Sequence, residues 1–401
     1  MWSLQPYTRG RLLGNILCYQ AGDSFRGVDA PTGVQRWTFD WDWGGNNELD
    51  TWSWGVVDSL VLLRGRRHDL VVLDALSGKL RWQRRTQQRV YVVVSDGIAF
   101  IASHEGPCLA FDAGSGTELW RLDLRPSAAP TALSAGAGIV CLPTESDEVL
   151  GIDAATGAKR WSSIAAPEHV IIQRQFGLVF LVHVDRLVAL DALSGLERWR
   201  FTAGGRIESR ILQDDRIIYV VNHVGTALST DHRSVLTAID ALTGEQSWCY
   251  ETDSHISSVG LAEHVVYVTD GDYYLHALEG HTGHESWCSE VWGENDDPVV
   301  VNETVFLADE RYGLRAVDAT TGAELWAFSP DESLASWSGA MVNGFLFAGA
   351  GTTVFVLDAV TGEELSLLAF DGLVITHVEA IDNVILAHGD DFLHALRLIP
   401  A

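Results

Sequence analysis

One short pattern returns nine times along the chain, and it constrains the fold more than any other feature. Each copy has an acidic residue, a glycine four residues later and, in all but the last copy, a tryptophan eight residues after the acid. Successive copies lie about forty residues apart, the repeat length of a propeller blade built from four short strands. The copies are Asp29, Gly33, Trp37; Asp74, Gly78, Trp82; Asp112, Gly116, Trp120; Asp153, Gly157, Trp161; Asp191, Gly195, Trp199; Asp240, Gly244, Trp248; Glu279, Gly283, Trp287; Asp318, Gly322, Trp326; and Asp358, Gly362, Ser366.

The repeat that contains Trp199 shows how one unit is expected to fold. Runs of strand-forming residues at 169–173, 178–182, 187–190 and 196–201 predict four antiparallel strands. The acid accepts hydrogen bonds from the backbone that follows, and the glycine supplies a positive φ for the turn. The flat tryptophan side chain fits between neighbouring blades and offers its indole N–H to a backbone acceptor. We therefore predict an all-β fold, with residues 1–401 forming a single β-propeller domain.

The two ends of the chain bear on the number of blades. Segments 9–13, 16–19 and 25–28 predict three strands before the first turn, and segments 376–380, 384–387 and 392–396 predict three after the last. Trp2 stands before the first of these segments at about the spacing of a signature tryptophan. The N-terminal residues are thus predicted to supply the fourth strand of the last blade and to close the ring. A literal count gives ten blades; smaller rings are commoner, so we expect eight to ten.

Composition excludes several classes of function. A net charge of −27 repels nucleic-acid phosphates and anionic lipid surfaces. No apolar run is long enough to span a bilayer. The N-terminus lacks a basic, apolar leader, and the residues before Cys18 lack the small side chains of a lipoprotein processing site. These observations predict a cytoplasmic location.

The repeat also carries a family resemblance over nearly the whole chain. Ala189 to Gly195 with Trp199, and Ala238 to Gly244 with Trp248, both read A-[LI]-D-A-x-[TS]-G-x-x-x-W. This phrase resembles the tryptophan-docking motif of the pyrroloquinoline-quinone (quinoprotein) propeller superfamily, which hosts unlike functions on one scaffold.

The resemblance implies three possible functions. Quinoprotein dehydrogenases bind the quinone with calcium over the propeller mouth, and many carry a vicinal disulfide, whereas the five cysteines here include no adjacent pair. Outer-membrane assembly lipoproteins are similar in length and repeat style. Non-enzymatic propellers, free-standing or attached to kinases, serve as binding platforms. We favour the last group, a scaffold for a protein partner without a cofactor. A channel-mouth ligand binder or enzyme, with the quinone and calcium as its cofactor, is the alternative.

Tryptophans outside the signature are the candidate partner-binding residues. Aromatic side chains clustered near a polar loop are typical anchors of protein recognition. For the alternating residues Trp52, Ser53 and Trp54, strand packing within a blade is the competing explanation. The candidates are Trp41, Trp43, Trp52, Trp54 and Trp337.

If the chain is an enzyme, Arg210, Asp297 and His377 are the candidate catalytic residues. Aligning the repeats on their turns places these three titratable residues in the strands expected to line the central channel. Converging there, they could perform acid–base chemistry. Their slots are widely spaced round a ring, however, and channel walls are commonly polar.

No metal site is expected from the sequence. His276, His281 and His284 lie close together, but without a carboxylate cluster or fixed helical spacing they are a poor zinc signal. The acidic stretches Asp270 to Asp272 and Glu294 to Asp297 do not complete a calcium loop. Cys249 and Cys288 each follow a signature tryptophan and are expected to occupy the same position in two blades.

Overall fold

The computed structural model contains strands, turns and loops in two compact units. One comprises residues 1–47, 75–79 and 254–401, and the other residues 48–74 and 80–253. None of the residues that the structure describes forms a helix long and apolar enough to cross a membrane. The described residues are 2–4, 11–21, 24–30, 32–40, 54–57, 59–64, 69–85, 90–103, 106–123, 133–144, 146, 148–164, 167–224, 233–291, 298–309, 313–331, 334–336, 341–370, 374–381, 384–389 and 392–397.

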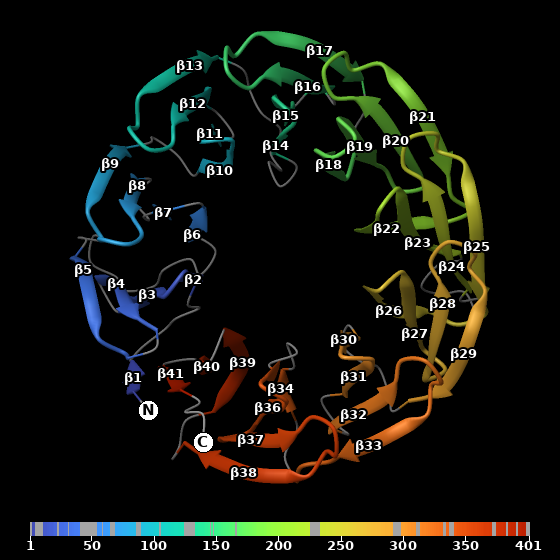
Figure 1. Ribbon diagram of the computed structural model, residues 1–401. Helices are drawn as coiled ribbons and strands as arrows, with labels where there is room; N and C mark the ends of the chain where they lie inside the picture. Colours follow the sequence, from blue (N-terminus) through green and yellow to red (C-terminus); the bar gives the residue numbers. More distant parts are fainter. Residues whose placement is uncertain are drawn as a thin grey trace. The chain divides into compact units, whose positions relative to one another are not determined.

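The described residues of the first unit form five antiparallel sheets, whose strands follow one another in chain order except in the last (Figure 1). The first four sheets are β2 (Arg11–Leu13), β3 (Ile16–Ala21), β4 (Ser24–Asp29) and β5 (Gln35–Asp40); β26 (Ile256–Ala262), β27 (Val265–Asp270), β28 (Tyr274–Glu279) and β29 (Glu285–Glu290); β30 (Val299–Val301), β31 (Thr304–Asp309), β32 (Gly313–Asp318) and β33 (Glu324–Phe328); and β34 (Leu334–Ser336), β36 (Phe345–Ala350), β37 (Thr353–Asp358) and β38 (Glu364–Ala369), with β35 (Met341–Val342) beside β36.

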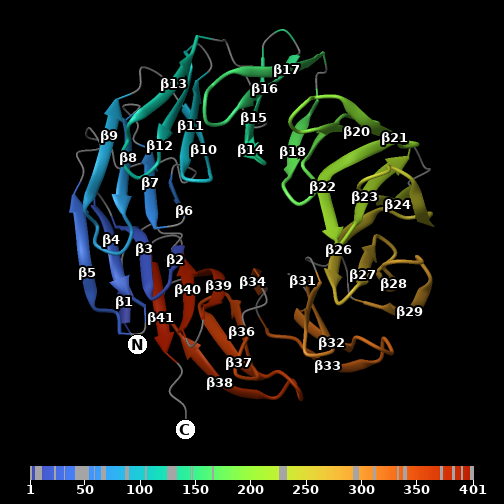
Figure 2. The same cartoon turned by 45° about the horizontal axis from the view of Figure 1, so that its top comes forward.

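The last sheet of this unit joins the two ends of the chain. It contains β39 (Ile375–Ile381), β40 (Val384–Gly389) and β41 (Phe392–Arg397), and β1 (Trp2–Leu4) pairs with β41 as its fourth strand (Figure 2). Trp2 lies opposite Ala395 in this pairing. The prediction that the N-terminal residues complete the last blade is confirmed.

The second unit repeats the same four-stranded pattern in five sheets. They are β6 (Trp54–Val57), β7 (Leu60–Arg64), β8 (Asp69–Asp74) and β9 (Leu80–Arg85); β10 (Val90–Ser95), β11 (Ile98–Ser103), β12 (Cys108–Asp112) and β13 (Glu118–Leu122); β14 (Ser134–Gly136), β15 (Ile139–Pro143), β16 (Glu148–Asp153) and β17 (Lys159–Ile164); β18 (His169–Gln173), β19 (Leu178–Val182), β20 (Arg186–Asp191) and β21 (Glu197–Thr202); and β22 (Arg206–Asp214), β23 (Ile217–Val224), β24 (Arg233–Asp240) and β25 (Gln246–Thr252).

Within each unit the hydrophobic core lies between successive sheets. One cluster combines Phe180 of β19 and Trp199 of β21 with Ile218 and Val220 of β23, so two neighbouring sheets share it. The second strands of the sheets are buried on both faces, as the all-buried pattern of Leu178–Val182 shows. The fourth strands bury essentially the tryptophan alone and expose the rest, as in Glu197–Thr202. The expected fold class, an all-β propeller of four-stranded antiparallel blades, is confirmed, while the number of blades in a ring and its closure stay predictions.

The signature turn forms the hydrogen bonds that the sequence predicts. At Asp191, Oδ1 accepts from the backbone N–H and the hydroxyl of Ser194, at 2.8 and 2.7 Å. The N–H of Gly195 donates to the Asp191 carbonyl at 2.8 Å. Arg198 donates to Asp191 Oδ2 at 2.6 Å, and with Ser194 it holds the pKa of this carboxyl well below its usual range. The acid thus closes its own turn, and Asp191, like Asp29, Asp74 and Asp153, also anchors the strand that follows through an arginine.

The signature tryptophan joins one sheet to the turn of the next. Trp161 Nε1 donates to the carbonyl of Ala192 at 2.8 Å, and Trp199 Nε1 donates to that of Ala241 at 2.9 Å. The Trp161 ring also lies directly against Gly195, where a Cβ would be only 2.3 Å from it. Glycine is therefore required twice, by its φ of +68° and by the ring stacked on it.

Replacing Gly195 with alanine is expected to destabilise the fold more than replacing Gly177. Both have positive φ, at +68° and +62°, so each alanine costs about 1–2 kcal/mol through the backbone. A Cβ at Gly177 meets nothing within 4 Å, whereas at Gly195 it collides with Trp161, which adds about 1–3 kcal/mol. Urea unfolding of both variants measures the difference. Equal losses would contradict a tight tryptophan–glycine contact.

Acid is expected to weaken the fold through Asp153. Hydrogen bonds from Thr156 and Arg160 lower its pKa from 3.8 to about 2 in the folded chain. Its contribution to the free energy of unfolding is therefore complete above about pH 4 and is lost as pH falls toward 2. Asp153→Asn should be less stable than wild type near pH 6, and the gap should narrow toward pH 2. Asp185→Asn removes an exposed charge outside any signature turn and is the control. A difference in the free energy of unfolding that stays constant with pH would refute the stabilising role of the Asp153 carboxylate.

Candidate functional site

Most of the candidate partner-binding residues lie where the structure gives no description. Trp41, Trp43, Trp52 and Trp337 fall outside the described residues, and of Trp54 only its place at the start of β6 is described. Their role in binding therefore stays a prediction.

The candidate catalytic residues are likewise untested as a group. Arg210 belongs to β22 in the second unit and His377 to β39 in the first, and the structure describes only their backbones. Asp297 lies outside the described residues. Their convergence stays a prediction.

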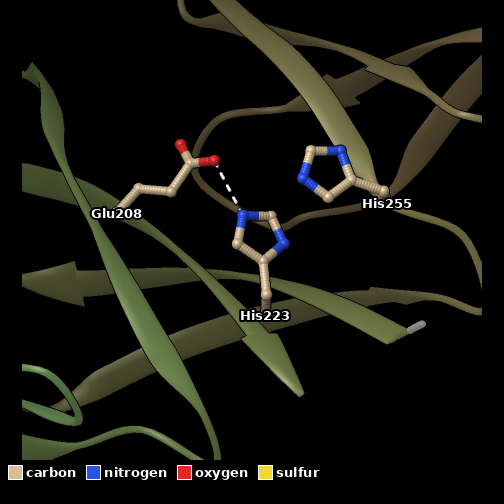
Figure 3. A group of neighbouring side chains, drawn as sticks. All are labelled: Glu208, His223 and His255. Carbon is tan, nitrogen blue, oxygen red and sulfur yellow. Dashed lines mark hydrogen bonds and ion pairs between the residues drawn. The ribbon is translucent and has the colours of Figure 1, made fainter. Parts of the chain in front are cut away.

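The second unit contains a hydrogen-bonded cluster that the sequence did not point to. In Figure 3 the Glu208 carboxylate lies against the ring of His223, whose Nε2 is 2.7 Å from Oε1. His255, drawn in the same view, belongs to the first unit. The other ring nitrogen of His223 is 2.8 Å from the Ser234 hydroxyl oxygen. Since an ionised carboxylate only accepts hydrogen bonds, His223 Nε2 is protonated and donates to Glu208.

Strand register explains how these three side chains meet. His223 of β23 lies opposite Arg206 of β22 on one side and opposite Ser234 of β24 on the other. The pairing of β22 with β23 skips from Ile207 to Ile211, and Glu208 lies in the skipped stretch. The irregularity therefore presents Glu208 to a histidine that regular pairing would not place opposite it.

The cluster is better suited to joining strands than to nucleophilic catalysis. A serine nucleophile must reach its substrate, but Ser234 is only 1% exposed. The Glu208 side chain is 37% exposed and that of His223 is 24% exposed, so the cluster runs from the surface into the sheet. It holds β22, β23 and β24 together through polar contacts.

A second cluster lies in the first unit, around His276 of β28. This residue is 8% exposed, and its Nδ1 is 2.9 Å from Glu285 Oε2 while its Nε2 is 3.3 Å from Asp270 Oδ2. Asp270, 4% exposed, is fixed in turn because its Oδ1 accepts the N–H groups of Asp272 and Tyr274 at 3.1 and 3.0 Å. Burial lowers the pKa of His276, but the hydrogen bonds to the two carboxylates outweigh it, so this pKa lies above its usual value.

Cys288 completes this second cluster. It lies opposite His276 in the pairing of β28 with β29, and its sulfur, a carboxylate oxygen of Glu285 and a ring nitrogen of His276 lie within 4.8 Å of one another. Burial raises the pKa of the thiol to about 11, and the charges of Glu285 and Asp270 add to the effect. The cluster is thus a concentration of negative charge around one imidazole, with Glu285 and Cys288 at the surface.

The structure changes the sequence interpretation of the neighbouring histidines. His276 does have carboxylates beside it, Asp270 and Glu285, whereas the sequence interpretation found none. His281 instead stacks on His264, with ring centroids 5.6 Å apart. Cys249 lies opposite Thr237 as Cys288 lies opposite His276, so the expected equivalence of these two cysteines is confirmed. Aligning the repeats and reading the residue opposite each cysteine would have indicated the cluster.

Removing the Ser234 hydroxyl is expected to lower stability. Ser234→Ala deletes a buried hydrogen bond to His223 and should cost about 0.5–1.5 kcal/mol. Ser162→Ala, at an exposed position of β17, is the control and should change the free energy of unfolding little. A Ser234 variant as stable as the control would show that the hydrogen bond contributes nothing.

Comparison with known proteins agrees with the repeat pattern. The family described as outer membrane protein assembly factor BamB matches residues 22–174, 172–260, 232–372 and 310–396. The assembly factor BamB of Nitrosomonas eutropha is 25% identical over 50% of this chain and 51% of its own. The serine/threonine-protein kinase AfsK of Streptomyces coelicolor is 29% identical over 44% of this chain and 21% of its own. The crystal structure of BamB from Moraxella catarrhalis covers 86% of this chain and 96% of its own, at 17% identity and a TM-score of 0.45.

These matches correct one expectation and confirm another. This chain spans about half the length of the BamB relative and about a fifth of the kinase. The predicted cytoplasmic location is wrong, because the matching family and relative are named as outer membrane protein assembly factors. The resemblance to quinoprotein-type propeller repeats is confirmed, and the chain belongs to the family described as outer membrane protein assembly factor BamB.

Proposed function

We propose that this chain is a non-enzymatic scaffold that holds a protein partner, and that the partner is a component of outer-membrane protein assembly. The observation that carries the proposal is the family match, which extends from residue 22 to residue 396 and includes every signature turn. The relative from Nitrosomonas eutropha is named for the same process.

The described surface suggests where such a partner does not bind. Exposed apolar side chains follow the signature acid by two residues in several turns, among them Leu193 at 63% and Val360 at 79%. They lie on different sheets, at most beside another aliphatic residue such as Leu196, and none of these exposed side chains is aromatic. Binding energy instead concentrates in clustered aromatic anchors. We therefore assign the contact to the segment from Trp41 to Trp54, together with Trp337.

Charge restricts the partner further. With 54 acidic against 27 basic residues the chain is strongly acidic, which favours a partner whose contact surface is basic. Association through such a surface is faster at low ionic strength and slows as salt is added.

Site-specific crosslinking tests both the function and the surface. A photoreactive amino acid at position 43 should crosslink to an outer-membrane assembly component in host membranes, and the product should be reduced at least several-fold by Trp52→Ala. The same label at Val360 is the matched control on an exposed turn and should not give that product. Equal crosslinking at both positions would refute the proposed surface. No assembly component crosslinked at either position would refute the proposed function.

A further inference from the structure

We propose that the chain binds a zinc ion through His276 Nδ1, a Glu285 carboxylate oxygen and the Cys288 thiolate, with Asp270 orienting the imidazole. The site belongs to the sheet β26–β29 and is separate from the proposed partner surface. It departs from the expectation, drawn from sequence alone, that the chain has no metal site.

The positions of the donor atoms support a common ligand. Atoms bound to one tetrahedral zinc ion lie about 3–4 Å apart, given bond lengths near 2.0–2.3 Å. The three donors here lie within 4.8 Å of one another, and Glu285 and Cys288 are exposed, so small side-chain rotations bring them to that spacing. A bulge in the pairing of β28 with β29, between Ala277 and Leu278, places Glu285 near the imidazole.

Asp270 has the role expected of an outer carboxylate beside a metal-bound histidine. Such histidines donate their second ring N–H to a carboxylate, which fixes the tautomer and the orientation of the ring. Here Nε2 of His276 faces Asp270, and two backbone N–H groups hold that carboxylate in place. Nδ1 is thereby left pointing toward the surface, at Glu285.

The donor set selects the metal. One imidazole nitrogen, one thiolate and one carboxylate suit zinc, whereas calcium and magnesium prefer oxygen ligands alone. Binding displaces the proton of His276 Nδ1 and the thiol proton of Cys288 to solvent. Three protein ligands leave a fourth position for water, on the exposed side of the cluster.

The other signature repeats hold different residues in this slot. In the next sheet Arg315 replaces His276 and forms an ion pair with Glu324 at 2.8 Å, while Ala327 replaces Cys288. In the preceding repeat Thr237 lies opposite Cys249. In the remaining repeats the pairs are Arg26 with Thr38, Val71 with Gln83, Leu109 with Arg121, Leu150 with Ser162, Val188 with Arg200 and Phe355 with Leu367. Histidine opposite cysteine thus occurs in one signature repeat, the one that also has Asp270 and Glu285 within hydrogen-bond distance of the ring.

Cobalt substitution tests the site directly. The full chain, reduced and freed of metal with a chelator, is titrated with Co²⁺ while absorption is recorded. We expect one equivalent to bind with a thiolate-to-cobalt charge-transfer band, and Zn²⁺ to displace it. Cys288→Ser should abolish the band. Asp270→Asn should weaken Zn²⁺ binding about 10–100-fold.

Cys249→Ser provides the matched control. It removes an exposed thiol from the equivalent position of another sheet and should leave the band and the affinity unchanged. Circular dichroism and thermal unfolding establish that each variant is folded, and Glu285→Gln, at an exposed residue, gives a second variant that should weaken binding. The proposal is overturned if wild type gives no charge-transfer band, if the band survives Cys288→Ser, or if Cys249→Ser removes it. Metal bound only at other histidines would give no charge-transfer band in wild type, which is the first of these results.

Discussion

The contact between a tryptophan of one sheet and the glycine turn of the next is the interaction on which the rest of the structure depends. It places the indole ring against a backbone that has no side chain and gives the indole N–H a carbonyl acceptor, as Trp161 does with Gly195 and Ala192. The apolar faces of neighbouring sheets do not by themselves fix how one sheet is aligned on the next, because hydrophobic packing is non-directional. An indole ring that packs on the glycine and donates to the neighbouring carbonyl oxygen fixes this alignment. Sheets formed from repeats of only about forty residues therefore stack in a defined way.

This contact also explains the one signature tryptophan that is missing. Within a unit, a signature tryptophan docks on the turn of the following sheet, as Trp326 does on Gly362. The sheet after Ser366 takes its fourth strand from the N-terminus, so no signature turn joins β41 to β1. A tryptophan at position 366 would have no glycine turn to receive it. The failure of the pattern at Ser366 therefore follows from the way in which the last sheet is completed.

The strands and turns of the repeats could be predicted from the sequence, because each repeat has the same strand-forming runs and turn residues in the same order. The strands around Trp199 and the pairing of β1 with β41 could be predicted from turn chemistry and spacing. The second cluster was missed because its members come from three strands, β27, β28 and β29, and are separated in sequence by up to eighteen residues. Sequence proximity instead suggested His281, whose ring lies against His264. Periodicity gives the strand register and the bulge that every signature repeat shares, as at Ala189 and Ala277, but a residue that differs in one repeat is recognised only beside its partner on the paired strand.

A repeat architecture separates the positions that make the fold from those free to acquire chemistry. The glycine and tryptophan positions are bound to the docking contact, and a substitution there is resisted by ring packing and backbone strain. The slot occupied by His276 lies on the strand before the signature turn and takes part in no docking contact, so it holds arginine in two sheets and valine, leucine or phenylalanine in others. The sheets therefore stack with any of these side chains in the slot. A chemical site can therefore arise in a single blade without disturbing its neighbours, and functional residues in such a chain are best sought where one repeat departs from all the rest.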